Sequence, residues 1–320
     1  MRLIERHEGV TLIELMVAVV ILAVLSAQLF LVFHTQKETY IANERALDAQ
    51  EDARLVADLV AADAHMAGYM LPKNAGVASI DGGTGGADDL CVSDWAAIND
   101  AVLPTAADHF NRARVLSLTN NTVTLQSLAQ LNVDNDGANP VDFLAPVGGT
   151  PGGGIILSNG IASHCAQIVS ISGTTITFDT LTPNSGPPAA GGVRASFLAN
   201  PGAVRAVPAV IYRITGGLGM TRNGMLISAE IEDLQVEFGV DANDDDALTG
   251  SEFPIHVLPG NLVNQVRAIR VSVIARSPQG EPSYQGPDRF RPATANRVAG
   301  AVDTFLRRRF VTSVLPRNML

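Results

Sequence analysis

Residues that carry out chemistry are scarce in this sequence. Its six histidines are scattered singly along the chain. The zinc-protease pattern HExxH, the serine-hydrolase pattern GxSxG and the glycine-rich phosphate loop are all missing. No cluster of nucleophile and base is visible either. We therefore expect that the protein is not an enzyme.

Basic residues are also few. Lysine and arginine together number 22, against 32 aspartates and glutamates, which gives a net charge of −10. A protein that binds nucleic acid shows a basic face to the phosphate backbone. The acidic balance therefore argues against a nucleic-acid partner, and it suits a protein that is exposed to divalent cations.

Only two cysteines occur, Cys91 and Cys165, and they do not form a CxxC pair. His164 is the only histidine near either of them, so a cysteine-based metal site is not expected. Two cysteines of one exported domain often pair in an oxidising compartment. The sequence leaves two interpretations open: a Cys91–Cys165 disulfide, or two free, buried thiols.

One long apolar run stands out near the N-terminus. Between Val10 and Phe33 the only charged residue is Glu14. About 20 apolar residues suffice for a helix that crosses a bilayer. Arg2 and Arg6 precede the run, and basic residues on that flank favour a cytoplasmic N-terminus. A carboxylate inside such a segment is costly, which makes Glu14 a candidate functional residue.

The residues Gly9-Val10-Thr11-Leu12-Ile13-Glu14 and the apolar run that follows resemble the class III signal sequence of type IV pilins and pseudopilins. The resemblance implies a leader over 1–9, which prepilin peptidase removes by cutting between Gly9 and Val10. Val10 would then be N-methylated and Glu14 would be the fifth mature residue. Most pilins begin with phenylalanine, so Val10 departs from the family pattern.

In that family the glutamate is thought to pair with the methylated amine of a neighbouring subunit. The physics agrees, because an ammonium partner lowers the cost of a carboxylate in a low dielectric. The resemblance therefore implies an assembly role for Glu14, with Thr11 hydrogen-bonding nearby. Alternatively, Glu14 lies close enough to the membrane surface to stay hydrated.

Beyond the apolar run the helix is expected to continue. Residues 34–68 contain no proline and no internal glycine, and they are rich in good helix formers. Gly68 and Pro72 provide a stop signal. This predicts one helix of about 55–60 residues, with 1.5 Å of rise per residue. Its second half, 34–70, shows a periodic apolar face made of Leu47, Leu55, Val56, Leu59, Val60 and Met66.

The rest of the chain shows patterns typical of strands. Two hairpins are predicted by alternating residues around Thr119-Asn120-Asn121 and around Ser172-Gly173. Longer strand patterns cover 204–214, 225–238 and 263–275, the last with the character of a central strand. Residues 71–112 look irregular.

The C-terminal segment resembles that of PilW-like minor pilins. The residues that carry this resemblance are Ile231–Asp241, Val266–Val271 and Arg317-Asn318, together with 61–69 at the helix end. It implies an α+β fold in which a long N-terminal helix, with a membrane half (10–33) and an amphipathic half (34–70), packs on an antiparallel β-sheet head. The head region would be 206–320, and 71–205 would be a variable β-rich insertion.

Two acidic stretches have the spacing of calcium ligands. Alternate oxygen-bearing residues, followed by a glutamate at the twelfth place, are typical of the EF-hand loop. The candidate ligands are Asp241, Asn243, Asp245 and Glu252 in one stretch, and Asn132, Asp134 and Asp136 in the other. Asp246 stands where that loop needs glycine, and no glutamate completes the second stretch. The alternative is a pair of solvated turns, and no cofactor is required.

The favoured hypothesis is a minor pilin that takes part in assembling or priming a type IV pilus. Its head would be periplasmic while the helix is held in the inner membrane, and it would later stand on the surface fibre, where the insertion could serve adhesion or motility. Its partners would be other pilins, through the N-terminal helix, and prepilin peptidase. The alternative is a minor pseudopilin of the J type in a type II secretion system.

Overall fold

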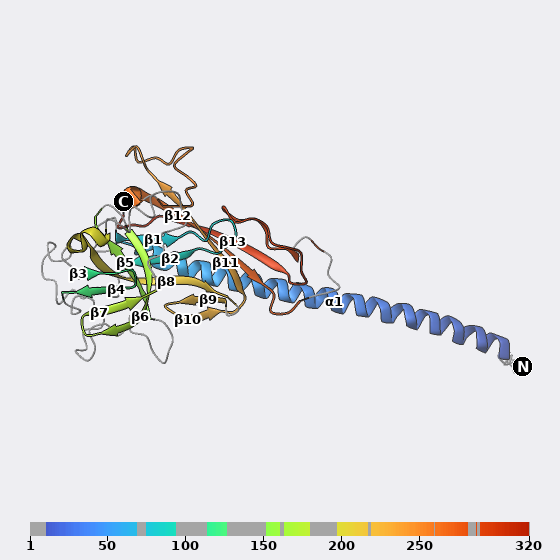
Figure 1. Ribbon diagram of the computed structural model, residues 1–320. Coiled ribbons are helices and arrows are strands. Elements are labelled where there is room, and N and C mark those ends of the chain that lie inside the picture. Colours follow the sequence, from blue (N-terminus) through green and yellow to red (C-terminus); the bar gives the residue numbers. More distant parts are fainter. Residues whose placement is uncertain are drawn as a thin grey trace, which may run out of the picture.

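A computed structural model shows a long helix that carries a β-rich head at one end (Figure 1). It describes residues 11–68, 75–93, 114–126, 152–160, 163–179, 197–216, 219–258, 260–280, 286 and 289–319. The α+β fold class is confirmed, with the helix first and antiparallel strands after it.

Helix α1 (Leu12–His65) contains 54 residues, which corresponds to about 81 Å. Its first part projects away from the head, with the N-terminus at its far end (Figure 1). Every residue of 11–37 in this part is exposed. The helix stops at His65, slightly earlier than Gly68 predicts, with Met66 as its C-cap.

For the second half of the helix, the prediction named mostly the wrong residues for the buried face. The residues that the head buries are mostly alanines: Ala46, Ala49, Ala53, Val56, Ala57, Val60 and Ala64. Leu47 and Leu55, which the periodicity placed on the buried face, are exposed by about two thirds. Small side chains let the helix backbone approach the strands closely, so the alanines and not the larger leucines line the contact. Val56 and Val60 belong to both sets.

Within the described residues the strands form two antiparallel sheets. The larger sheet contains β1 (Val77–Ile80), β2 (Asp89–Ser93), β3 (Val115–Leu118), β4 (Thr122–Leu125), β5 (Gly154–Ser158), β6 (Ser163–Ser172), β7 (Thr175–Phe178), β8 (Arg205–Thr215), β9 (Gly219–Arg222) and β10 (Met225–Ser228). The smaller sheet contains β11 (Ile231–Val240), β12 (Val266–Arg276) and β13 (Arg307–Val314).

Most strand predictions are confirmed and two are not. Both hairpins form, as β3–β4 and β6–β7, and β12 is the central strand of the smaller sheet. The stretch 225–238 is not one strand, because it divides between β10 and β11. The stretch 71–112, expected to be irregular, contains β1 and β2. Their short lengths and glycine-rich connection hid them from a search for long alternating patterns.

Helix α1 packs mainly on β12 and β13. Its alanine face shares one core with β2, β8, β11 and β12, in which the aromatic members are Tyr212 and Phe238. A second core fills the space under β3, β4, β6 and β7, around Phe178 and Phe197. The helix is therefore held mainly by the smaller sheet, with a contribution from β2 and β8 of the larger one, while β3, β4, β6 and β7 cover a core of their own.

The larger sheet curls back on itself, and a disulfide closes the curl. The path of paired strands runs β2–β8–β5–β6, and a flat sheet would put β2 and β6 about 14 Å apart at 4.8 Å per strand. Cys91 on β2 and Cys165 on β6 nevertheless form a disulfide, with their Cα atoms 5.8 Å apart. Small and medium-sized apolar side chains fill the curl: Ala75, Ala78, Ile156, Val207, Ala209 and Ile211. At Gly154 a Cβ would lie 2.9 Å from the Ala209 carbonyl oxygen, so the turn of the sheet needs glycine there.

The predicted border between insertion and head does not separate two sheets. It falls at 205/206, and β8 begins at Arg205. This strand pairs with β2 and β5 from the proposed insertion and also with β9 from the proposed head. The domain division therefore stays a prediction, and one continuous sheet crosses it.

The C-terminal residues cap the end of α1. The N–H of Arg317 donates to the carbonyl of His65 at 3.3 Å, and the Asn318 amide donates to the carbonyl of Met66 at 3.4 Å. Helix C-termini leave carbonyls without partners inside the helix. The buried Met319 packs where Cβ atoms on Gly68 and Gly76 would collide with it. The Arg317-Asn318 pair therefore has a structural role at the junction of helix and sheet.

The alanine contact can be tested by exchanging side-chain size. Ala53 is fully buried against the head, so Ala53→Leu should overpack the contact and lower the free energy of unfolding by about 1–3 kcal/mol. Leu55→Ala, two residues away on the exposed face, should change it by less than about 0.5 kcal/mol. Urea unfolding of the full-length chain in detergent, followed by circular dichroism, measures both. A larger loss for Leu55→Ala would contradict the observed packing.

Candidate assembly site

The projecting part of α1 presents apolar side chains on all sides. Residues from Leu12 to Phe33 are exposed around the whole circumference, and α1 is the described helix long and apolar enough to cross a membrane. A soluble helix would show one apolar stripe and a charged face. This part of the helix therefore needs lipid or another protein around it.

A capping box surrounds the one carboxylate of this segment. Glu14 Oε2 accepts hydrogen bonds from the Thr11 backbone N–H at 2.9 Å and from the Thr11 hydroxyl at 3.0 Å. The Thr11 Oγ1 accepts in return from the Glu14 N–H at 3.3 Å. These contacts satisfy backbone N–H groups at the start of the helix. They also give the carboxylate two hydrogen-bond donors within its own chain. The structure thus brings Thr11 and Glu14 together, whereas Gly9 and Val10 lie outside the described residues.

In the acidic loop 241–252, carboxylates accept hydrogen bonds from the backbone of the loop itself. Asp241, which is fully buried, accepts the N–H groups of Asp245 and Asp246 at 3.0 Å. Glu252 accepts from the N–H groups of Ala242 and Thr249 at 2.9 and 3.0 Å. Asp244 and Asp246 have positive φ angles, which the glycine of an EF-hand loop adopts without strain. The loop is therefore folded around amide donors.

A guanidinium lies beside these carboxylates. Arg267 on β12 approaches the carboxylates of Asp241, Asp244 and Asp246 at 3.6, 3.5 and 3.9 Å. Its positive charge offsets the charges that a calcium ion would otherwise offset. No group of three or more His, Cys, Asp or Glu side chains able to hold a metal occurs in the described residues. The other candidate ligands, Asn132, Asp134 and Asp136, lie outside them.

An ionic cluster between α1 and the larger sheet was not predicted from the sequence. The buried Tyr212 on β8 donates its hydroxyl proton to Asp63 of α1, and Arg222 on β9 forms an ion pair with Asp63 at 3.0 Å. Burial, and next the negative charge of Asp63, raises the pKa of Tyr212, so the phenol stays protonated. The cluster fixes the end of α1 to the larger sheet.

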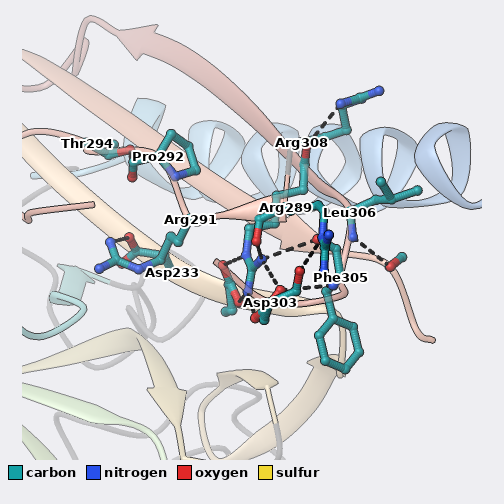
Figure 2. A network of polar contacts seen from close by, with 12 residues as sticks. Asp233, Arg289, Arg291, Pro292, Thr294, Asp303, Phe305, Leu306 and Arg308 are labelled. Carbon is teal, nitrogen blue, oxygen red and sulfur yellow. Dashed lines mark hydrogen bonds and ion pairs between the residues drawn. The ribbon is translucent and has the colours of Figure 1, made fainter. Parts of the chain in front are cut away.

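Further ion pairs tie the segment 289–306 to the smaller sheet. Asp233, fully buried on β11, forms ion pairs with Arg291 and Arg297. Arg307 on β13 contacts Asp303 at 2.6 Å and Glu232 at 2.6 Å. Figure 2 shows Asp233 beside Arg291, and Asp303 among the arginines of the same network. A buried carboxylate is tolerated when it is paired in this way.

Asp88 joins the two sheets. Its N–H donates to the carbonyl of Leu234 on β11 at 2.8 Å, and its carboxylate accepts from the N–H groups of Val236 at 2.7 Å and Gly82 at 2.9 Å. Burial raises the pKa of Asp88 to about 7, with a smaller contribution from the charges of Asp81 and Asp233. Asp88 thus makes hydrogen bonds with the outer edge of β11 that a neighbouring strand would otherwise make.

Comparisons with known proteins give two matches within the sequence. Residues 199–318 match the family described as type IV pilus-assembly protein W, PilW. Residues 6–27 match the prokaryotic N-terminal methylation motif, which includes the stretch from Gly9 to Glu14. The two matches cover the apolar start of the chain and the strands that hold its helix.

The chain thus carries the N-terminal methylation motif of type IV pilins and a PilW-like C-terminal region.

Two further comparisons add little. No curated protein matches the chain. Among solved structures, a type IV-like pilin from Thermus thermophilus shows 14% identity over 52% of this chain and 85% of that one, with a TM-score of 0.23. A likeness this low carries no argument about the head.

The two matches give the apolar helix a role. The methylation motif and the exposed helix fit a membrane-anchored pilin that is assembled into a surface pilus. The pilus-assembly domain implies contacts with other pilus components and processing by prepilin peptidase. The matched domains are structural rather than catalytic.

The pKa of Asp88 predicts a pH dependence of stability. Its carboxyl group titrates near pH 7 in the folded chain and near 3.8 in the unfolded one, so the folded chain binds more protons between these values. Stability should therefore fall as the pH rises from about 4 to about 7. Asp88→Asn should flatten this decline, whereas Asp58→Asn on the exposed face of α1 should leave it unchanged. Urea midpoints at pH 5 and pH 8 give the comparison, and equal slopes for all three chains would contradict the assignment.

The place of Arg267 predicts how the acidic loop responds to calcium. The melting temperature of the unchanged chain should shift little in millimolar Ca²⁺, because Arg267 already offsets the carboxylates. Arg267→Met removes that charge and should make the shift larger. Thermal unfolding with Ca²⁺, and with Mg²⁺ as the control ion, measures this. A large calcium shift of the unchanged chain that Arg267→Met does not increase would contradict it.

Proposed function

We propose that this chain is a minor pilin that prepilin peptidase cuts between Gly9 and Val10, and that it helps to assemble or prime a type IV pilus. The observation that carries the proposal is the pairing of an uncovered apolar helix with a single capped carboxylate, Glu14, in a chain that also matches the methylation motif. The role is structural, so no catalytic activity is proposed.

The capping box suits a subunit that must wait in the membrane. Before assembly, the Thr11 donors lower the cost of holding the Glu14 carboxylate in the bilayer. When a neighbouring subunit arrives, its methylated amine supplies a full positive charge, which is a stronger partner than a neutral hydroxyl. The carboxylate thereby favours subunits that pair with a neighbour over subunits that stay alone.

We favour a pilus over a type II secretion pseudopilus as the destination. The match over residues 199–318 is to a pilus-assembly family, and these residues include β11, β12 and β13, on which α1 is held. Cells that lack the chain should therefore lose surface pili while they still secrete enzymes normally. The opposite result would favour the J-type pseudopilin.

An adhesive or motility role of the head is part of the proposal. The strands from the stretch 71–205 lie mostly at the end of the head far from the apolar helix (Figure 1). Removing this stretch would not test the idea cleanly, because β8 pairs with β2 and β5 from within it. Point substitutions on exposed faces are needed instead.

Calcium remains an optional ligand in this proposal. The oxygen atoms of Asp241, Asn243, Asp245 and Glu252 lie in one loop, but they are already engaged by amide donors. Binding would need those hydrogen bonds to rearrange, so the fold does not depend on the ion.

The assembly role is tested by Glu14→Ala. The variant should fold and reach the inner membrane normally, while its amount in sheared pili should fall by at least roughly tenfold, because a charge pair made only in the fibre is lost. Glu51→Ala, an exposed helical glutamate beyond the apolar run, is the matched control. Immunoblots of membrane and pilus fractions give both amounts, and normal incorporation of Glu14→Ala would sink the assembly role.

A further inference from the structure

One face of the β3–β4–β7–β6 region is covered by hydroxyl groups in register. Ser117 on β3 lies opposite Thr124 on β4, Thr124 lies opposite Thr175 on β7, and Thr175 lies opposite Ser172 on β6. Directly opposed residues of antiparallel strands point to the same side of the sheet. These four residues therefore make one row of hydroxyls across four strands.

A second row runs beside the first. Thr122 on β4 lies opposite Thr177 on β7, which lies opposite Ser170 on β6. Neighbouring strands are about 4.8 Å apart and same-face residues on one strand about 6.7 Å apart. We name the seven residues of the two rows the hydroxyl face: Ser117, Thr122, Thr124, Ser170, Ser172, Thr175 and Thr177.

The hydroxyl face lies over a packed core, is open to solvent and is uncharged. The alternate residues Val123, Leu125, Ile176 and Phe178 are buried in the core beneath it, while its serines are exposed and its threonines half-buried. Thr124 and Thr175 are hydrogen-bonded through their hydroxyls at 3.2 Å. The stretches 115–125 and 168–178 contain no charged residue, in a chain of which 17% is charged.

These properties select a class of ligand. Each hydroxyl donates one hydrogen bond and accepts two, so it can bind the hydroxyls of another molecule in either direction. A polyanion would need basic residues, which the hydroxyl face lacks. A protein partner would need aromatic or arginine side chains as anchors, and the hydroxyl face has only threonines and serines. Leu116 and Val169, exposed at irregular positions of β3 and β6, add small apolar contacts of the kind that sugar C–H groups make.

We propose that the hydroxyl face binds neutral, hydroxyl-rich polysaccharide. The proposal rests on the proposed adhesive role of the pilus subunit and names its ligand class. In Figure 1, β3, β4 and β7 lie at the end of the head opposite the N-terminus of α1, so the hydroxyl face lies far from the anchored end. An open array of weak contacts suits an extended surface rather than one sugar in a pocket.

The test is sedimentation of the full-length chain, in detergent, with insoluble cellulose and insoluble β-1,3-glucan. Cross-linked polygalacturonate serves as the anionic comparison. The double substitution Thr124→Val with Thr175→Val removes one pair of hydroxyls and keeps the β-branched shape, so the strands should persist. Binding to the neutral glucans should fall by roughly tenfold, as expected for the loss of two hydrogen-bonding groups.

A matched control and a second variant keep the result interpretable. Thr312→Val on β13 is the same change at a half-buried position of the other sheet, and it should leave binding unchanged. Ser170→Ala with Ser172→Ala alters exposed residues and should lower binding even where the valine pair disturbs folding. Unchanged binding in both hydroxyl-face variants would overturn the proposal, as would binding to polygalacturonate alone or to none of the three.

The amount of each variant in sheared pili separates this proposal from the assembly role. Hydroxyl-face variants should assemble as well as the unchanged chain and still fail to hold the glucans. Normal pili from Glu14→Ala would end the assembly role whatever the face binds. Absence of glucan binding by the unchanged chain would end the present proposal however well pili assemble.

Discussion

The structure depends on one helix whose two parts need different surroundings. From Leu12 to Phe33 it offers apolar side chains in every direction, which water cannot accommodate. From Ala46 onward it offers a narrow stripe of small residues that the head buries. The head cannot cover the first part, because it begins to bury the helix only at Ala46. Lipid and neighbouring subunits are the two environments that can cover it.

The head is organised to hold that helix firmly. Its C-terminal residues cap the carbonyl end of α1, and Asp63 is bound by Tyr212 and Arg222 from the larger sheet. Asp88 joins the larger sheet to β11, and Asp233 attaches a long C-terminal segment through two arginines. Force applied to the helix would therefore pass into both sheets through packed side chains and paired charges.

The sequence predicted those parts of the molecule that local patterns encode. The apolar run, a Thr11 hydrogen bond near Glu14 and both hairpins follow from composition and spacing within a few residues. The leucines misled because periodicity reports that a helix has an apolar face, but not which apolar residues the partner buries. Ala53 and Ala57 carry little hydrophobic signal, yet their small size decides the contact.

The ionic joints and the curl of the sheet could not be predicted, because they unite residues far apart in the chain. Asp63 and Tyr212 are separated by 149 positions, and the sequence around either residue does not indicate its partner. A cross-strand closure such as Cys91–Cys165 requires knowing that β8 and β5 lie between β2 and β6. The acidic loop shows the reverse case: its spacing is that of calcium ligands, but Arg267 on the neighbouring strand β12 already offsets their charge.

The central claim is that this helix is handled as a pilin helix, and the N-terminus of the mature protein reports on it most directly. Mass spectrometry of the chain recovered from membranes and from sheared pili identifies the first residue and its modification. The account predicts a chain that begins with N-methylated Val10 in both fractions. A chain that still begins at Met1 in both would contradict it.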